Sequence, residues 1–356
     1  MKHAFGRGPV PGFSIVIPTY RRRRSLERVL AGVRDQEYPI DRLEVIVVND
    51  GGDDGTVEMV RRLDLGFNLL LLEQQNRGPG AARNLGVEHA AGPFVLFLDD
   101  DVVPTSRLVA EHASAHCERR DLVVMGSMLG DGRERMPWLR WESVTLAKQY
   151  EDMDAGLFKP TPWQFYTGNA SLRREHVIQA GGFDPRYRRA EDVELGFRLE
   201  RLGLTFVFDR RAEGLHLLRR SYAAWLDGAR QYGRNDVLFG KVTERVIAET
   251  RTRHRYTRRL IRWGIGHRRL RSAVAPAVKL AAGASFAAGL SGASLAACGA
   301  VFNLHYWLGV EEALGPAETR RLLSQVESDE GPEPEPPRRE SRQGGSLPIG
   351  LDNGPP

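Results

Sequence analysis

The feature that most constrains this chain is a regular alternation of short apolar runs with helical patterns over its first hundred residues. Four apolar runs predict buried strands, at 13–17, 45–48, 68–72 and 94–98. The segments between them predict helices, at 22–33, 56–63 and 79–90. This alternation predicts an α/β fold in which helices cover both faces of a mostly parallel sheet. Ligands of such sheets bind beyond the carboxyl ends of the strands.

Beyond Pro104 the pattern is more mixed. Further strands are expected at 122–125, 165–172 and 205–208. Further helices are expected at 173–180, 193–202 and 222–240, whereas 131–159 gives no clear signal. We therefore predict one main domain with two halves, followed by a basic and apolar helical segment and a disordered tail rich in Gly, Pro and charge. The expected bounds are an extension at 1–12, the domain at 13–240 with halves 13–104 and 105–240, the helical segment at 241–314 and the tail at 315–356.

The charge of the chain is uneven. The formal net charge is +5, and residues 251–271 contain nine arginines and no acidic residue. No nucleic-acid-binding motif accompanies this basic run, so we expect no nucleic acid partner. The two cysteines, Cys117 and Cys298, have neither zinc-site nor disulfide-framework spacing. Residues 1–12 lack the apolar stretch of a signal peptide, so we expect the protein to be cytoplasmic.

Three adjacent aspartates, Asp99, Asp100 and Asp101, directly follow the apolar run at 94–98. Adjacent carboxylates repel one another unless a positive charge lies between them. Mg²⁺ and Mn²⁺ are bound by one or two carboxylates together with the oxygens of a diphosphate, so the cluster predicts a divalent cation site. The alternative is an acidic loop that caps a helix starting near Thr105, which accounts for one aspartate and not for three.

Four motifs occur in a fixed order, namely SIVIPTYRRR (14–23), VIVVNDGGDDGT (45–56), NRGPGAARNLG (76–86) and FVLFLDDDVVP (94–104). In this order and at these spacings they resemble the family 2 glycosyltransferases, over about residues 13–240. The resemblance implies the GT-A fold, which is a Rossmann-like, mostly parallel sheet with flanking helices. It also implies a nucleotide diphosphate sugar as donor and Mn²⁺ or Mg²⁺ as cofactor.

The resemblance assigns a nucleotide pocket to the first two motifs. Pro18, Thr19 and Tyr20 are expected to line the site of the base and ribose. Asp50 matches the family aspartate that accepts a hydrogen bond from a base N–H, which favours uracil and is compatible with some other bases.

The resemblance also implies a metal and diphosphate site. Asp99 and Asp101 match the family's Asp-x-Asp metal motif, and Asp100 is expected to contact the ribose or the metal. Arg83 is expected to contact the donor, the alternative being a solvent-exposed helix arginine. His216 is expected to be a further metal ligand, as in several members of the superfamily, and neutral imidazole suits Mn²⁺ better than Mg²⁺. Its alternative is an ordinary core or surface histidine between leucines.

A second acidic pair, Glu191-Asp192, follows the turn GGFD (181–184) at the start of a predicted helix. Acidic residues are favourable at a helix N-terminus, so this pair has a purely structural alternative. The arrangement resembles the family's Glu-Asp motif, in which the aspartate is the general base that activates the acceptor hydroxyl. We therefore predict Asp192 as the base and Glu191 as a positioning residue. A single displacement then inverts the configuration of the transferred sugar.

The predicted activity is transfer of a sugar, with UDP as the expected nucleotide, to a carbohydrate or lipid-linked acceptor in cell-envelope polysaccharide or glycolipid synthesis. Two alternatives stay open. One is a non-catalytic, membrane-associated sugar-nucleotide-binding protein of the same fold. The other is a sugar nucleotidyltransferase, which should carry a glycine-rich loop and a downstream lysine after the first strand, where this chain has Pro-Thr-Tyr-Arg (18–21).

The segment 280–310 contains no charged residue and is long enough to cross a bilayer. It is rich in Ala, Gly and Ser, so a soluble helical hairpin is the alternative. The adjacent basic run favours anionic lipid, and we expect association with the inner face of the cell membrane. Trp138, Trp141 and Trp163 suit either an acceptor sugar or the protein core.

Overall fold

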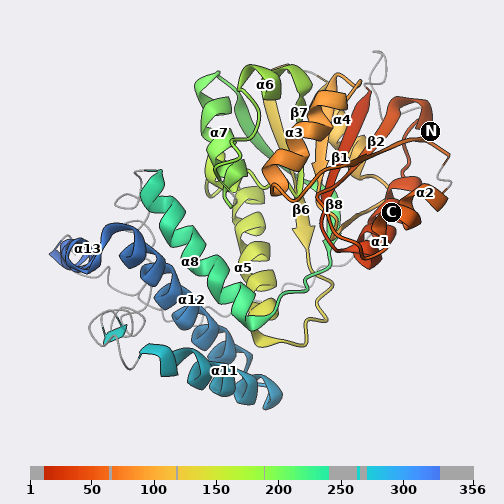
Figure 1. The fold of residues 1–356 in the computed structure, drawn as a ribbon. Coiled ribbons are helices and arrows are strands. Elements are labelled where there is room, and N and C mark those ends of the chain that lie inside the picture. The colour runs from red at the N-terminus through yellow and green to blue at the C-terminus, as the bar shows by residue number, and fades with distance from the viewer. Residues whose placement is uncertain are drawn as a thin grey trace, which may run out of the picture.

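A computed structural model describes residues 12–63, 66–117, 119–187, 189–239, 263–264 and 271–328. The described strands form one mixed sheet in the order β3-β2-β1-β4-β7-β6-β8-β5 (Figure 1). Their bounds are β1 (Phe13–Thr19), β2 (Leu43–Asn49), β3 (Asn68–Glu73), β4 (Phe94–Leu98), β5 (Val102–Pro104), β6 (Leu122–Leu129), β7 (Asn169–Arg173) and β8 (Thr205–His216).

The first half of the sheet is parallel, as the alternation of strands and helices predicts. Strand β1 pairs in parallel with β2 on one side and with β4 on the other, so Ile15 lies opposite both Val45 and Leu96. The second half is mixed, because β7 runs antiparallel to β4 and β6, and β5 runs antiparallel to β8. The predicted α/β class is confirmed, and the carboxyl ends of β1, β2 and β4 meet at one edge.

Helices cover both faces of the sheet, so the strands are buried on both sides. Along β1, Ile15 and Ile17 face one core cluster with α1, α2 and α4, and Val16 faces the other with α3, α6 and α7. The helix bounds are α1 (Arg23–Arg34), α2 (Thr56–Arg62), α3 (Pro79–His89), α4 (Leu108–Ala115), α5 (Pro137–Asp154), α6 (Arg174–Gln179), α7 (Glu191–Arg201) and α8 (Tyr222–Leu238), with 3₁₀ turns at Ile40–Arg42 and Pro162–Gln164.

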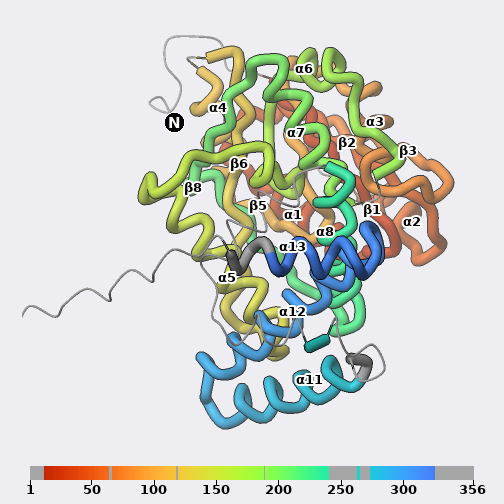
Figure 2. Tube along the Cα trace, turned by 90° about the vertical axis from the view of Figure 1, so that its left-hand side faces the viewer, coloured from red at the N-terminus to blue at the C-terminus, as the bar shows by residue number. Residues whose placement is uncertain are grey.

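Three further helices, α11 (Arg271–Ala287), α12 (Ser291–Leu314) and α13 (Pro316–Ser328), follow the main domain in the chain. Figures 1 and 2 both show α11 on the far side of α12 from the sheet. Helix α12 packs along α8 and also contacts α5, α11 and α13. Two glycines permit this close packing, because a Cβ at Gly309 would overlap the carbonyl oxygen of Arg230 and one at Gly233 that of Tyr306.

The tryptophans at 138 and 141 belong to the core between α5, α8 and α12. Trp138 packs against Tyr222 with tilted rings, and Trp141 lies against Trp225 and Phe302. Trp163 packs against Phe197 and Phe239. Of the two alternatives for these residues, the structure supports packing within the protein.

Three details of the predicted organisation are corrected. The expectation of disorder at 315–328 is wrong, because α13 occupies Pro316–Ser328 and its Leu322 and Leu323 pack near Tyr306 and Trp307. The segment 131–159, where the sequence shows no clear signal, contains α5, and the short strand β5 was not predicted between the aspartates and the helix α4, which begins at Leu108. The described part of 241–314 is not a separate unit, because α12 packs on α8. Residues 1–11, 240–262, 265–270 and 329–356 lie outside the described residues.

Within the described residues, α12 is the one helix long and apolar enough to cross a membrane by length and composition. However, 61% of its most apolar stretch is buried within the protein, and the core helix of a soluble domain passes the same test. The structure therefore gives only weak support for a membrane-spanning helix.

Candidate active site

The site is built at the edge where β1, β2 and β4 end. Thr19, the last residue of β1, is 3% exposed, and its hydroxyl donates a hydrogen bond to Asp100 Oδ2 at 2.7 Å. Pro18 pairs with Val48 inside the parallel ladder, and Tyr20 follows with 43% of its side chain exposed. The Pro-Thr-Tyr motif therefore connects a buried strand to an open surface beside the aspartates.

Asp50 directly follows β2 and is buried, at 4% exposure. Its carboxylate accepts hydrogen bonds from Gln74 Nε2 at 2.6 Å and from the backbone N–H groups of Arg77 and Gly78, both at 2.9 Å. These bonds fix the loop that enters α3, where Gly78 has a φ of +94° that favours glycine. A carboxylate has about four acceptor positions, so Asp50 retains capacity for one more donor.

Arg83 joins the two groups of carboxylates that the sequence places far apart. Its Nη2 lies 2.7 Å from Asp99 Oδ1, and its Nη1 lies 2.8 Å from Glu191 Oε1. The residue is 4% exposed, which excludes the solvent-exposed alternative. A buried guanidinium is costly unless it is paired, so these two carboxylates hold it in position. The end of β4 and the start of α7 are thereby tied together across α3.

A second arginine, Arg22, neutralises the rest of the aspartate cluster. Its Nη1 lies 3.3 Å from Asp100 Oδ1 and also bonds to Asp101 Oδ2. Burial raises the pKa of Asp100 to about 7, although Arg22 favours the ionised carboxylate. The pairing of β5 with β8 sets Val102 opposite His216, and His216 Nε2 lies 3.7 Å from Asp101 Oδ1.

The donor set at this edge fits a hard divalent cation in its chemistry, since it offers carboxylate oxygens and one imidazole. The structure brings Asp101 and His216 together, but it directs Asp99 Oδ1 to Arg83. In the part of the chain that the structure describes, no three acidic, histidine or cysteine side chains converge as a ready metal site. Gly168 leaves room for Asp99, because a Cβ there would lie 2.9 Å from Asp99 Oδ2.

Glu191 and Asp192 begin α7, just after Ala190, whose φ of +56° is unusual for a residue with a side chain. Asp192 is partly exposed, and its Oδ1 accepts a hydrogen bond from the backbone N–H of Val193 at 2.9 Å. Burial, together with repulsion from Glu191, raises the pKa of Asp192 to about 7, and Arg83 opposes this rise. A carboxylate with such a pKa is suited to accept a proton near neutral pH.

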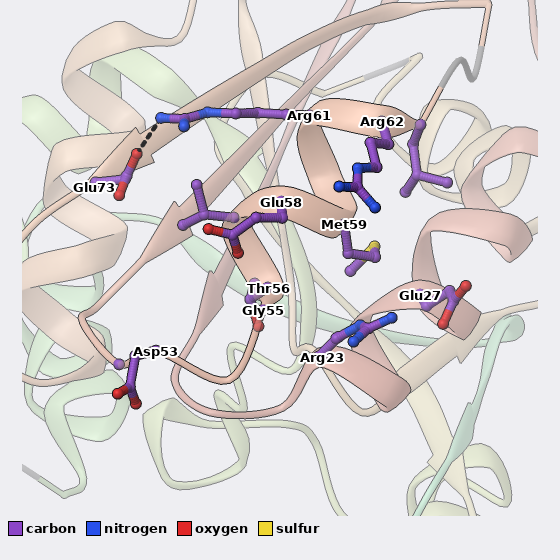
Figure 3. Close-up of a pocket in the computed structure, with 13 residues that line it drawn as sticks. Arg23, Glu27, Asp53, Gly55, Thr56, Glu58, Met59, Arg61, Arg62 and Glu73 are labelled. Carbon is purple, nitrogen blue, oxygen red and sulfur yellow. Dashed lines mark hydrogen bonds and ion pairs between the residues drawn. The ribbon is translucent and has the colours of Figure 1, made fainter.

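A hollow of about 770 Å³ lies between α1, α2 and the loop after β2. Figure 3 shows that Arg23, Arg62 and Glu27 lie around it, with Arg61 paired to Glu73 at 2.8 Å. It borders Gly52 and Asp53, which follow Asp50, but neither the aspartate cluster nor Asp192 lines it. The hollow is therefore a neighbour of the site and not its centre.

Sequence reasoning missed three contributors to the site: Arg22, Gln74 and Gly168. Arg22 belongs to an arginine run directly after the Pro-Thr-Tyr motif, which was a visible signal that one of these charges faces the aspartates. Gln74 directly follows β3, and Gly168 directly precedes β7. Neither has a local pattern that reveals its distant partner.

The strand order and the helices on both faces of the sheet define a fold of the GT-A type. Residues 14–181 match the family model described as glycosyl transferase family 2. Mannosyltransferase PcManGT from Pyrobaculum calidifontis, solved in complex with GDP-Man and Mn²⁺, has the same fold with a TM-score of 0.51. That likeness covers 91% of this chain and 77% of PcManGT at 18% sequence identity.

Two curated relatives are glycosyltransferases. The uncharacterized glycosyltransferase YfnE of Bacillus subtilis is 29% identical over 251 residues, which are 57% of this chain and 64% of YfnE. Validoxylamine A glucosyltransferase of Streptomyces hygroscopicus subsp. jinggangensis is 30% identical over 233 residues, which are 58% of this chain and 55% of that enzyme. The chain is thus similar to glycosyltransferase family 2 over residues 14–181, and to these two glycosyltransferases over more than half of its length. It matches less than two thirds of the length of these relatives.

Proposed function

We propose that this enzyme transfers a glycosyl group from a nucleotide diphosphate sugar to an acceptor hydroxyl with inversion at the anomeric carbon. The observation that carries the proposal is the double ion pair of Arg83, at 2.7 Å to Asp99 and 2.8 Å to Glu191. It holds the aspartate cluster and the Glu191-Asp192 pair in one site. A donor-binding group and a base for the acceptor are what such a displacement requires.

In the proposed reaction, Asp192 takes the proton of the acceptor hydroxyl as its oxygen bonds to the anomeric carbon. The bond from that carbon to the diphosphate oxygen breaks, and the nucleoside diphosphate leaves with the electron pair. Glu191 is held by its ion pair with Arg83, and burial together with the nearby Glu191 keeps the pKa of Asp192 high. Asp192 is therefore the only member of this pair that we assign to proton transfer.

The nucleotide is proposed to lie between the Pro-Thr-Tyr turn and Asp50. Pro18, Thr19 and Tyr20 would contact the base and ribose, and the remaining acceptor position of Asp50 would take a base N–H. Uracil offers such an N–H, so UDP is the first candidate. PcManGT, which has the same fold, was solved in complex with GDP-Man, so GDP is the second nucleotide to test.

The residues proposed to hold Mn²⁺ or Mg²⁺ are Asp99, Asp101 and His216, with Asp100 reaching the ribose or the metal. When bound, such an ion supplies Lewis acid stabilisation to the departing diphosphate. Arg83, buried beside Asp99, is positioned to add a fixed positive charge for the donor.

The proposed acceptor is a carbohydrate or a lipid-linked sugar of cell-envelope polysaccharide or glycolipid synthesis, at the inner face of the cell membrane. The basic run at 251–271 supports attraction to anionic lipid. The exposed side chains of Leu280 and Leu290, at 74% and 59%, support contact with an apolar phase.

The decisive experiment measures release of UDP and GDP from a panel of nucleotide sugars by the full-length protein, with Mn²⁺, with Mg²⁺ and with excess EDTA. We expect turnover of one nucleotide class with metal and its loss in EDTA. Undiminished turnover in EDTA would remove the metal roles of Asp99, Asp101 and His216. Binding of a nucleotide sugar without any hydrolysis or transfer would favour the non-catalytic alternative.

A further inference from the structure

The two arginines that pair with carboxylates of the site differ in their exposure to solvent. Arg83 has 5% of its side chain exposed and is closed in by its partners, whereas Arg22 has 46% exposed. Arg22 nevertheless makes the contacts to Asp100 and Asp101 that neutralise the aspartate cluster. The guanidinium of Arg83 is therefore buried, whereas that of Arg22 lies at the surface.

The backbone of Arg22 is fixed although its side chain is open to solvent. Its carbonyl oxygen accepts hydrogen bonds from the N–H groups of Ser25 and Leu26, at 3.1 and 3.0 Å, at the start of α1. The hydroxyl of Ser25 donates to the same oxygen at 3.0 Å. The preceding residue, Arg21, has a φ of +54°, so the turn into α1 contains a left-handed backbone conformation that is unusual for a residue with a side chain. Only the long side chain of Arg22 is free to change partners.

Asp101 is the point at which two positive groups compete. One of its oxygens bonds to Arg22, and the other lies 3.7 Å from His216 Nε2, where the proposed cation would be bound. A divalent cation on Asp101 repels a guanidinium at hydrogen-bond distance from the same carboxylate. Binding of a cation to Asp101 therefore weakens the ion pair between Asp101 and Arg22.

We propose that Arg22 is an exchangeable counter-cation, which neutralises Asp100 and Asp101 in the free enzyme and transfers to the donor diphosphate when a divalent cation takes Asp101. The inference rests on the proposed function for its donor. The planar guanidinium suits phosphate oxygens, to which it binds through two parallel N–H groups. When the cation and the donor bind together, the cation replaces Arg22 as the counter-charge of Asp101, and Asp100 keeps the hydrogen bond from the Thr19 hydroxyl.

The test compares Mn²⁺ binding to the full-length wild type, R22Q, R22K and R23Q without nucleotide, from the electron paramagnetic resonance of free Mn²⁺. Removing the competitor should tighten Mn²⁺ binding about fivefold in R22Q, the effect of one partly exposed ion pair. R22K keeps the charge and should resemble the wild type. R23Q removes a charge one residue away, on the side of the hollow, and should also resemble the wild type (Figure 3).

The second measurement is the affinity of UDP and GDP by calorimetry, at saturating Mn²⁺, with circular dichroism as the check of folding. R22Q should bind the active nucleotide about tenfold more weakly, the loss of one charge-assisted hydrogen bond. R23Q should bind as the wild type does. Unchanged or weaker Mn²⁺ binding by R22Q, or unchanged nucleotide affinity, overturns the inference. If the wild type binds neither UDP nor GDP, the proposed function fails instead, and the Mn²⁺ series still decides whether Arg22 competes with the cation.

Discussion

At the scale of single residues, two neighbouring carboxylates of the proposed site have different partners. Glu191 is paired with Arg83 at 2.8 Å, whereas Asp192 Oδ1 accepts a hydrogen bond from the backbone N–H of Val193. The pKa of Asp192 is raised to about 7 by burial and by Glu191. Their surroundings therefore favour the proposed division, in which Asp192 takes the proton and Glu191 positions Arg83.

Asp192→Asn should lower turnover by about 100-fold or more, because it removes the base and keeps the shape of the side chain. Donor affinity should change little, since Asp192 is not among the proposed donor contacts. Steady-state transfer assays and calorimetry on the same variant measure the two effects. Glu200→Gln, an exposed position on the same helix, is the matched control. Near-normal turnover of Asp192→Asn would show that Asp192 is not the base, and that Glu191 and Asp192 are acidic residues of an ordinary helix N-terminus.

Asp101→Asn should behave differently from Asp192→Asn. It removes a charge from the proposed cation site, so metal-dependent donor binding should weaken together with turnover. The measurement is donor affinity at several Mn²⁺ concentrations. If donor affinity is unchanged at every Mn²⁺ concentration, Asp101 does not hold the cation.

The raised pKa of Asp192 also predicts a pH dependence of stability. A carboxyl group whose pKa is higher in the folded state stabilises the fold most below its unfolded pKa, near 3.9. This contribution is lost as the pH rises through about 7. The wild type should therefore lose stability relative to Asp192→Asn between pH 4 and pH 7, in urea unfolding without metal. A constant difference between the two proteins over this range would contradict the raised pKa.

At the scale of elements, the contact between α8 and α12 decides whether the C-terminal helices are part of the domain. Gly233 and Gly309 allow the two backbones to touch, and the aromatic side chains of Trp141, Trp225 and Phe302 fill the space beside them. A composition rich in Ala and Gly, which favours close packing in a membrane, here serves packing within the protein.

Gly309→Ala should destabilise the protein by about 1–3 kcal/mol, because the new methyl group overlaps the Arg230 carbonyl and pushes α12 from α8. Gly283→Ala is the control, since a Cβ at this helical position meets nothing within 4 Å. It should be neutral or stabilise by up to about 1 kcal/mol through helix propensity. Urea unfolding of both variants provides the comparison, and equal effects would refute the close contact.

At the scale of the whole molecule, the end formed by α11 lies away from the sheet in both views (Figures 1 and 2). Leu280 and Leu290 are exposed there, and the basic run at 251–271 directly precedes α11 in the chain. A membrane approached by this end would meet the exposed apolar side chains of Leu280 and Leu290.

The full-length protein should co-sediment with anionic vesicles more than with neutral ones, and high salt should weaken the binding. Leu280→Glu should reduce binding, whereas Leu238→Glu, at an exposed leucine of α8, should not. Equal recovery with anionic and neutral vesicles would contradict the role of the arginines. No recovery with either would remove the main support for a lipid-linked acceptor.

The sequence alone was enough to predict the strands of the first half, the α/β class and the residues at the strand ends. Each buried strand of this half is a short apolar run bounded by polar residues, so its signal is local. Asp99 was identified because it follows such a run directly, whereas Thr19 and Asp50 were identified through the resemblance to the family 2 glycosyltransferases. The same reasoning failed for α13 and β5, whose positions depend on packing or pairing with distant segments.

Only the tertiary structure decided which charges neutralise the carboxylates. Arg83 and Glu191 are 108 residues apart, and Arg22 and Asp100 are 78 residues apart, so no periodicity in the chain relates them. Their pairing results from the sheet order, which brings the ends of β1 and β4 and the start of α7 to one edge. The sequence shows that an arginine carries a positive charge, but not which carboxylate neutralises it. The fold decides this by bringing one distant carboxylate within a few ångströms, because Coulomb interactions depend on separation in space and not along the sequence.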